Sequence, residues 1–143
     1  MRRKVRSGKP RVVVDTSVLV AGISGFRHPF VSGRNASADV LHRWAAKNNF
    51  VWLISEDVLD EYKEVLRRLR VRSHSIGRVI NLIRERAEEV NVRTLTQLSP
   101  DPSDDAFCLC AERGKADFIV TLNPRDFPDE RLSARVIAPA FLV

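Results

Sequence analysis

Short apolar runs recur along the chain, separated by stretches with helical periodicity. Residues 12–14 (VVV) and 50–54 (FVWLI) have the length and β-branched or aromatic content of buried strands. Residues 116–121 and 134–137 form two similar runs, and residues 91–95 form a weaker one. We expect a strand at each of these five places.

Helical patterns lie between these runs. An apolar stripe at helical spacing runs from Val58 to Leu69 after Ser55, a residue favoured at helix N-caps. Similar patterns predict helices over residues 38–47 and from 76 to about 90, and residues 106–111 are apolar on every side. Strands that alternate with helices predict an α/β protein, a three-layer α/β/α sandwich around a mostly parallel sheet.

Length and charge define the organisation. The 143 residues suit one domain, which we place at residues 11–143 after a basic N-terminal arm at residues 1–10. Lys and Arg number 24 against 18 Asp and Glu, and the resulting charge of +6 favours a nucleic-acid partner. No stretch resembles a secretory signal or a membrane span, so we expect a cytoplasmic protein.

Isolated polar residues follow the predicted strands. Asp15 ends the first strand, and Asp105 precedes the apolar helix at residues 106–111. Glu61 lies in the helix after the second strand, at the margin of the apolar stripe, and is the acid of that helix best placed to reach inward. Asn123 and Asp126 follow a later strand. Since ligands bind beyond the carboxyl ends of parallel strands, we expect these side chains at one edge of the sheet. Clustered carboxylates repel one another, and a hard divalent cation such as Mg²⁺ or Mn²⁺ would relieve that repulsion.

Other chemistries have less support. Cys108 and Cys110 are two apart on a predicted helix and therefore point to nearly opposite sides, and the three histidines lack the spacing of zinc ligands. Asp15 or Asp105 also fits a helix cap, Glu61 a solvated acid and Asp126 a turn residue.

The ordered motifs resemble those of the PIN-domain nucleases. VVVDTSVL at residues 12–19 is similar to the family's first motif, and ISEDVLDEYKEVL at residues 54–66 to its second. DPSDDAFCLCA at residues 101–111 and ADFIVTLNPRDF at residues 116–127 resemble the third and fourth. VIAPAFL at residues 136–142 resembles the terminal strand and tail.

This resemblance implies a set of roles. Asp15, Glu61 and Asp105 would be catalytic metal ligands, and Asp126 or Asn123 would complete the acidic pocket. Many relatives have Asp at the position of Asn123, so the chain carries one negative charge fewer there. The supporting residues around the pocket would be Ser17, Thr121 and Asp104, of which the two hydroxyls brace the rim or orient a carboxylate.

Within this family the chain resembles the VapC-like, single-domain toxins of toxin–antitoxin pairs. That resemblance implies an RNA substrate, an inhibitory antitoxin protein and a homodimer. Candidate phosphate contacts near the acidic rim are Arg11, Arg27 and Arg34, together with the basic arm. A second cluster, Arg67 to Arg72, contacts RNA or only complements the dipole of its helix.

Two alternatives stay open. A non-catalytic nucleic-acid-binding or interaction module with the same fold is suggested by Asn123. An aspartyl nucleophile at Asp15, as in some phosphatases, is disfavoured because Ser17 occupies the place of the second Asp that such enzymes use.

Overall fold

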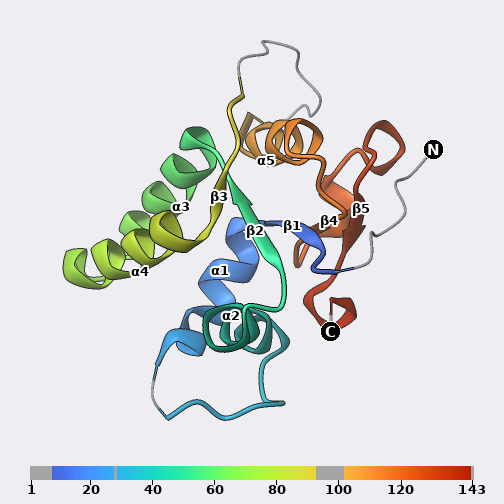
Figure 1. Cartoon of the computed structure of the whole chain (residues 1–143). Coiled ribbons are helices and arrows are strands. Elements are labelled where there is room, and N and C mark those ends of the chain that lie inside the picture. Colours follow the sequence, from blue (N-terminus) through green and yellow to red (C-terminus); the bar gives the residue numbers. More distant parts are fainter. Residues whose placement is uncertain (1–7, 28, 93–101, 143) are drawn as a thin grey trace.

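Five parallel strands form one sheet at the centre of the protein (Figure 1). The structure is a computed structural model that describes residues 8–27, 29–92 and 102–142, with side chains from residue 105 in the last range. The strands lie in the order β3-β2-β1-β4-β5. Their bounds are Arg11–Val14 for β1, Val51–Ile54 for β2, Glu88–Glu89 for β3, Phe118–Val120 for β4 and Arg135–Ile137 for β5.

Strand β1 is the middle of the sheet. Val13 pairs with Leu53 of β2 on one side and with Ile119 of β4 on the other. Val12, Val13 and Val14 are completely buried, because helices cover both faces of the sheet at this strand. This explains why β1 is a continuous apolar run instead of an alternating one.

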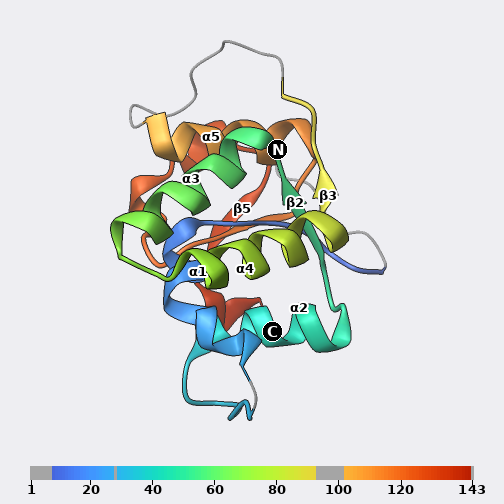
Figure 2. The same cartoon turned by 90° about the vertical axis from the view of Figure 1, so that its left-hand side faces the viewer.

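Helices form the outer layers. Their bounds are Thr16–Gly22 for α1, Ala36–Lys47 for α2, Glu56–Arg68 for α3, Ser73–Arg86 for α4 and Pro102–Arg113 for α5. Helix α5 packs on β1, β2 and β4, whereas α1 packs on α2 and α3. Figure 2 shows α5 above the sheet and α1 and α2 below it. The three-layer α/β/α sandwich with a parallel sheet is therefore confirmed.

The contact between α1 and α2 depends on two glycines. A Cβ atom on Gly22 would lie 2.5 Å from the backbone of Ser37, and one on Gly25 would lie 2.5 Å from the carbonyl oxygen of Ala38. Gly25 belongs to the 3₁₀ helix η1 (Ile23–Phe26), which directly follows α1. Close backbone approach is thus the reason for glycine here.

Two elements differ from the sequence prediction. The weak strand expected at residues 91–95 is wrong for 91–92, and residues 93–101 lie outside the described part. The edge strand is instead β3, which pairs Leu53 with Glu88 and Ile54 with Glu89. The helix predicted from 76 to about 90 included these two exposed acids, which do not follow a strand pattern, but α4 ends at Arg86. Helix α5 also begins before Asp105, at Pro102, because proline fits the first helical position.

The cysteines are structural. Cys108 and Cys110 are both buried and neither forms a disulfide bond, and burial raises the pKa of the Cys110 thiol to about 12. Among the described residues, no helix is long and apolar enough to cross a bilayer.

Candidate functional site

The strand order creates a crevice beside β1. From β1 the chain passes to β2 and β3 on one side, and then returns to β4 and β5 on the other. Ligands in open parallel sheets bind at such a reversal, outside the carboxyl ends of the strands. The residues that follow β1 and β4 are Asp15 and Thr121, so these two line the switch point.

Asp15 is held rigidly at this point. Its residue is only 7% exposed, and its Oδ2 atom accepts hydrogen bonds from Ser17 Oγ at 2.6 Å and from Thr121 Oγ1 at 2.8 Å. Its backbone N–H donates to the carbonyl of Val120 at 2.9 Å. Although Asp15 is the N-cap residue of α1, its side chain forms no capping hydrogen bond. Helix capping therefore does not explain this carboxylate.

The two hydroxyls also fix the loop after β4. Ser17 Oγ accepts from the N–H of Leu122 at 3.1 Å, and Thr121 Oγ1 accepts from the N–H of Asn123 at 3.0 Å. The hydroxyls therefore orient the Asp15 carboxylate and brace the rim at the same time.

Tyr62 anchors the end of β1 next to Asp15, whereas its place in the apolar stripe predicted only a core residue. Its hydroxyl donates to the carbonyl of Val14, the residue before Asp15, and accepts from Trp52 Nε1 at 3.2 Å. Burial raises the pKa of Tyr62 well above its usual value, which keeps this hydroxyl protonated as a donor. The sequence feature that could have indicated these hydrogen bonds is a tyrosine within an apolar stripe, because a buried phenol needs a polar partner.

Glu61 adjoins Tyr62 in α3. It is partly buried, whereas the other acids of this helix, Glu56, Asp57, Asp60 and Glu64, are exposed. The prediction that Glu61 points inward more than its neighbours is confirmed. The Tyr62 hydrogen bond ties this turn of α3 to the end of β1, where Asp15 follows.

The remaining acids are less closely placed. Asp105 is partly buried in the first turn of α5, whereas Asn123 and Asp126 are exposed, the latter in the 3₁₀ helix η2 (Pro124–Asp126). The side chain of Asp104 lies outside the described residues. Among those described, no group of three or more His, Cys, Asp or Glu side chains is arranged to hold a metal ion. Hydrogen bonds thus join Asp15, Ser17 and Thr121, whereas the convergence of Asp15, Glu61 and Asp105 on one metal ion stays a prediction.

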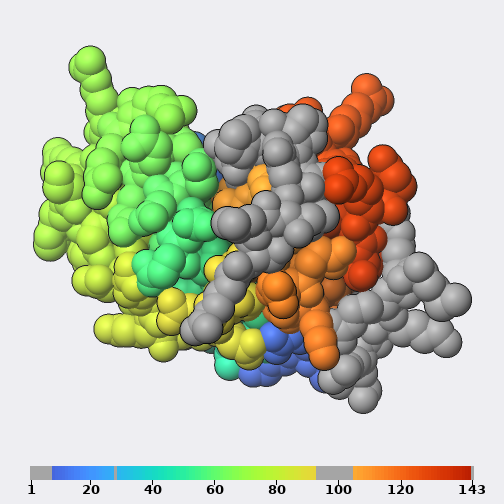
Figure 3. All heavy atoms as spheres, turned by 90° about the horizontal axis from the view of Figure 1, so that it is seen from above, coloured from blue at the N-terminus to red at the C-terminus, as the bar shows by residue number. Residues whose placement is uncertain are grey.

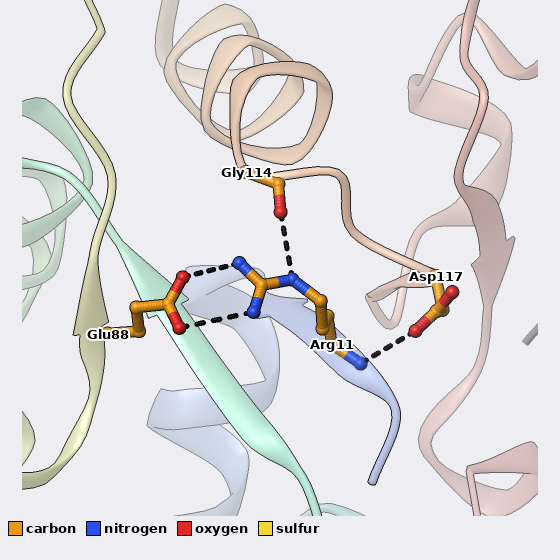
Figure 4. A network of polar contacts seen from close by, with 4 residues as sticks. All are labelled: Arg11, Glu88, Gly114 and Asp117. Atoms are coloured by element: carbon orange, nitrogen blue, oxygen red, sulfur yellow. Dashed lines mark hydrogen bonds and ion pairs between the residues drawn. The ribbon is translucent and has the colours of Figure 1, made fainter. Parts of the chain in front are cut away.

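Arg11 is not at the acidic rim, contrary to the sequence prediction. It starts β1 and therefore lies at the opposite end of the strand from Asp15. Figure 4 shows its guanidinium against the Glu88 carboxylate and the carbonyl of Gly114, while its N–H donates to Asp117 Oδ2 at 2.8 Å. Arg11 is a structural residue that joins β1 to β3 and to the end of α5.

Arg27 and Arg34 are also away from the rim. Arg27 ends η1, and Arg34 lies in the exposed segment before α2. Because α1 begins next to Asp15 and continues into η1, these arginines follow the far end of that helical stretch. Neither is a neighbour of the Asp15 site.

Comparison with known proteins agrees with this architecture. A family model described as PIN domain matches residues 11–125. The solved structure of VapBC2 from Rickettsia felis bound to a DNA fragment from its promoter contains a similar chain, with a TM-score of 0.55 and 15% identity over 89% of this chain and 96% of that one. At this identity the likeness shows the fold alone. No curated protein matches. The family match spans most of the sequence, and the chain therefore belongs to the PIN domain family.

Proposed function

We propose that the protein is a divalent-metal-dependent endoribonuclease that hydrolyses RNA phosphodiesters at the Asp15 site. PIN domains are generally nucleases, and membership of the family supports this chemistry. The observation that carries the proposal is the Asp15 carboxylate, nearly buried at the switch point and fixed by the hydroxyls of Ser17 and Thr121. Such a fixed carboxylate is what a metal-dependent hydrolase requires of its first ligand.

The donor chemistry at Asp15 fits a hard cation. Both hydroxyl donors bind Oδ2, which leaves the other carboxylate oxygen to a ligand, and oxygen ligands suit Mg²⁺ or Mn²⁺. In this proposal Glu61 and Asp105 complete the ligand set, and Asp126 or Asn123 adds an outer oxygen. When bound, the metal supplies an activated water and offsets the charge that develops on phosphorus.

The chain's own residues supply positioning. Ser17 and Thr121 hold the Asp15 carboxylate in one orientation, and Tyr62 anchors the end of β1. These bonds lower the cost of ordering the site when substrate binds. Glu61 is the neighbour of Tyr62 in the turn of α3 that this bond fixes, which supports its role as a second ligand.

A toxin–antitoxin role extends the proposal. The fold of the chain is that of a chain in the VapBC2 structure, and the VapC-like sequence motifs agree with it. We propose that the protein is the toxin of such a pair, a cytoplasmic homodimer silenced by a small antitoxin. Co-expression with the product of a small neighbouring reading frame tests this role. A stable complex with suppressed RNA cleavage is the expected result, and unaltered cleavage without a complex contradicts it.

A cleavage assay tests the enzymatic proposal. A labelled single-stranded RNA is incubated with Mg²⁺ or Mn²⁺, and with EDTA. Asp15→Asn and Glu61→Gln should lower the rate by at least about 100-fold, because each removes a metal ligand. Glu64→Gln, which changes an exposed acid one turn further along α3, is the matched control and should retain the wild-type rate. Cleavage that persists in EDTA, or in both site variants, would refute the proposal.

A non-catalytic RNA-binding module is the second candidate. It is favoured by Asn123 at the rim and by the lack of a three-acid group among the described residues. It predicts RNA binding without cleavage and without Mn²⁺ uptake, so the same assay separates the two candidates.

A further inference from the structure

The hairpin formed by α3 and α4 carries a run of arginines that no acid interrupts in the sequence. Between Glu64 and Glu85 the sequence contains six arginines and no acid. Four of them, Arg67, Arg70, Arg72 and Arg78, are here named the hairpin arginines. All four are exposed. The hairpin stands at the left of Figure 1, and Figure 3 shows the light-green atoms of this region at the periphery of the molecule.

Salt bridges do not neutralise this surface. Arg68 pairs with Glu64 at 3.1 Å and Arg84 with Glu56 at 3.1 Å, and these are the two remaining arginines of the run. Within the described part of the chain, none of the hairpin arginines forms a salt bridge or a side-chain hydrogen bond. Their charge is therefore available to an external anion.

The stability of the two helices does not explain why all four positions are arginine. The helix dipole explains Arg67, in the last turn of α3, but not Arg72, which is the N-cap residue of α4 without a capping side chain. A cation is unfavourable at that end of a helix, and α4 has no acid in its first turn. Arg70 has a φ of 60°, a left-handed conformation that favours glycine. Two of the four thus occupy positions where arginine disfavours the local structure.

The hairpin extends from the Asp15 site. Helix α3 begins after β2 at the carboxyl edge, and Tyr62 ties it to the end of β1. Arg68 lies seven residues after Glu61, on the same face of the helix and about 10 Å further along it. This distance corresponds to roughly three stacked nucleotides. A single RNA strand that crosses the Asp15 site and follows α3 therefore arrives at the turn between α3 and α4.

We propose that the hairpin arginines bind the phosphate backbone of the RNA substrate several nucleotides away from the bond that is cleaved. Arginine side chains on an exposed, acid-free surface suit phosphate contacts, which supply affinity without sequence preference. This inference rests on the proposed nuclease function, because it places a substrate strand at the Asp15 site.

Equilibrium binding in EDTA tests the inference without cleavage. A fluorescein-labelled single-stranded RNA 20-mer is titrated with wild-type protein and with the tip variant Arg70→Gln, Arg72→Gln, Arg78→Gln. The matched control variant is Lys47→Gln, Arg113→Gln, Arg135→Gln, which neutralises three exposed cations elsewhere. Both variants reduce the net charge from +6 to +3, so a difference between them reflects location and not total charge.

The tip variant should bind at least about tenfold more weakly than the control variant at ~0.1 M salt, and its salt slope should fall by about 2 for three lost phosphate contacts. Equal affinities of the two variants would overturn the inference, as would the absence of RNA binding by the wild type. The two variants are also titrated with polyglutamate. If the tip variant loses affinity for polyglutamate but not for RNA, the inference is overturned in favour of an acidic protein partner. Failure of the nuclease proposal is separate, because it appears as absent metal-dependent cleavage.

Discussion

Thr121 connects the two strands that border the switch point. Its hydroxyl donates to Asp15 Oδ2 and accepts from the N–H of Asn123, so one side chain orients the carboxylate and fixes the loop after β4. Thr121 is completely buried, and no water replaces either bond at low cost if the hydroxyl is removed. The geometry of the site thus depends on a residue that is not itself an acid.

Replacing Thr121 with valine preserves the shape and removes the hydroxyl. We expect a free energy of unfolding lower by ~1–3 kcal/mol, because the N–H of Asn123 and the nearly buried Asp15 carboxylate each lose a partner. RNA cleavage should fall by roughly 10–100-fold, as for other residues that orient a metal ligand. Urea unfolding and initial cleavage rates measure both effects. Thr121→Ser is the control, and a wild-type rate in Thr121→Val would show that the bond to Asp15 is dispensable.

At the other end of β1, we expect a substitution of Arg11 to affect stability and not RNA binding. Arg11→Gln loses the Glu88 pair and weakens the bond to Gly114, so the free energy of unfolding should fall by about 1 kcal/mol, a modest value because Glu88 is half exposed. RNA affinity should fall no further than in the single variant Lys47→Gln, which removes the same charge elsewhere. A larger loss of affinity in Arg11→Gln would restore Arg11 to the RNA-binding surface.

The Arg11 pair also makes a pH prediction. Hydrogen bonding to Arg11 lowers the pKa of Glu88 below its usual value. A carboxyl group with a lowered folded pKa stabilises the protein above its unfolded pKa, near 4.3, and this stabilisation is lost as the pH falls through the folded value. The stability difference between wild type and Arg11→Gln should therefore be present at pH 7 and smaller at pH 3. Urea titrations at the two pH values measure it.

At the scale of elements, the packing of α1 on α2 decides where the chain goes after Asp15. Gly22→Ala would place a Cβ atom 2.5 Å from the backbone of Ser37, and backbone atoms cannot rotate away. We expect a destabilisation of about 2–3 kcal/mol, in the range of overpacked cores. Gly77→Ala is the matched control: no atom lies within 4 Å of its added Cβ atom in α4, so helix propensity should raise stability by up to about 1 kcal/mol. Similar effects in both variants would contradict the close approach of α1 to α2.

The elements that the sequence predicted best are those that the core dictates. The buried run of β1 and the stripe of α3 follow directly from burial, and so do the end of β1 at Asp15 and the inward position of Glu61. Strand β3 was missed because it consists of two exposed acids whose pairing with β2 is a tertiary effect. The role of Arg11 was missed for the same reason, since its partner Glu88 is 77 residues away.

At the scale of the whole molecule, charge and chemistry are separated. The Asp15 site lies at the carboxyl edge of the sheet, whereas Arg27, Arg34 and the hairpin arginines lie on segments further from it. This arrangement suits a polyanion that is held by surrounding cations while one phosphodiester faces the carboxylates. The sequence established the positive charge but not its distribution, because the fold decides which arginines adjoin the site.

The central claim is that Asp15 and Glu61, which lie 46 residues apart in the sequence, serve one divalent cation. Calorimetric titration with Mn²⁺ tests it most directly, with wild type, Asp15→Asn, Glu61→Gln and the control Glu64→Gln compared at the same pH. We expect wild type and Glu64→Gln to bind Mn²⁺, and each of the other two variants to lose at least about tenfold in Mn²⁺ affinity. Mn²⁺ affinity that is unchanged in Asp15→Asn or in Glu61→Gln would contradict it.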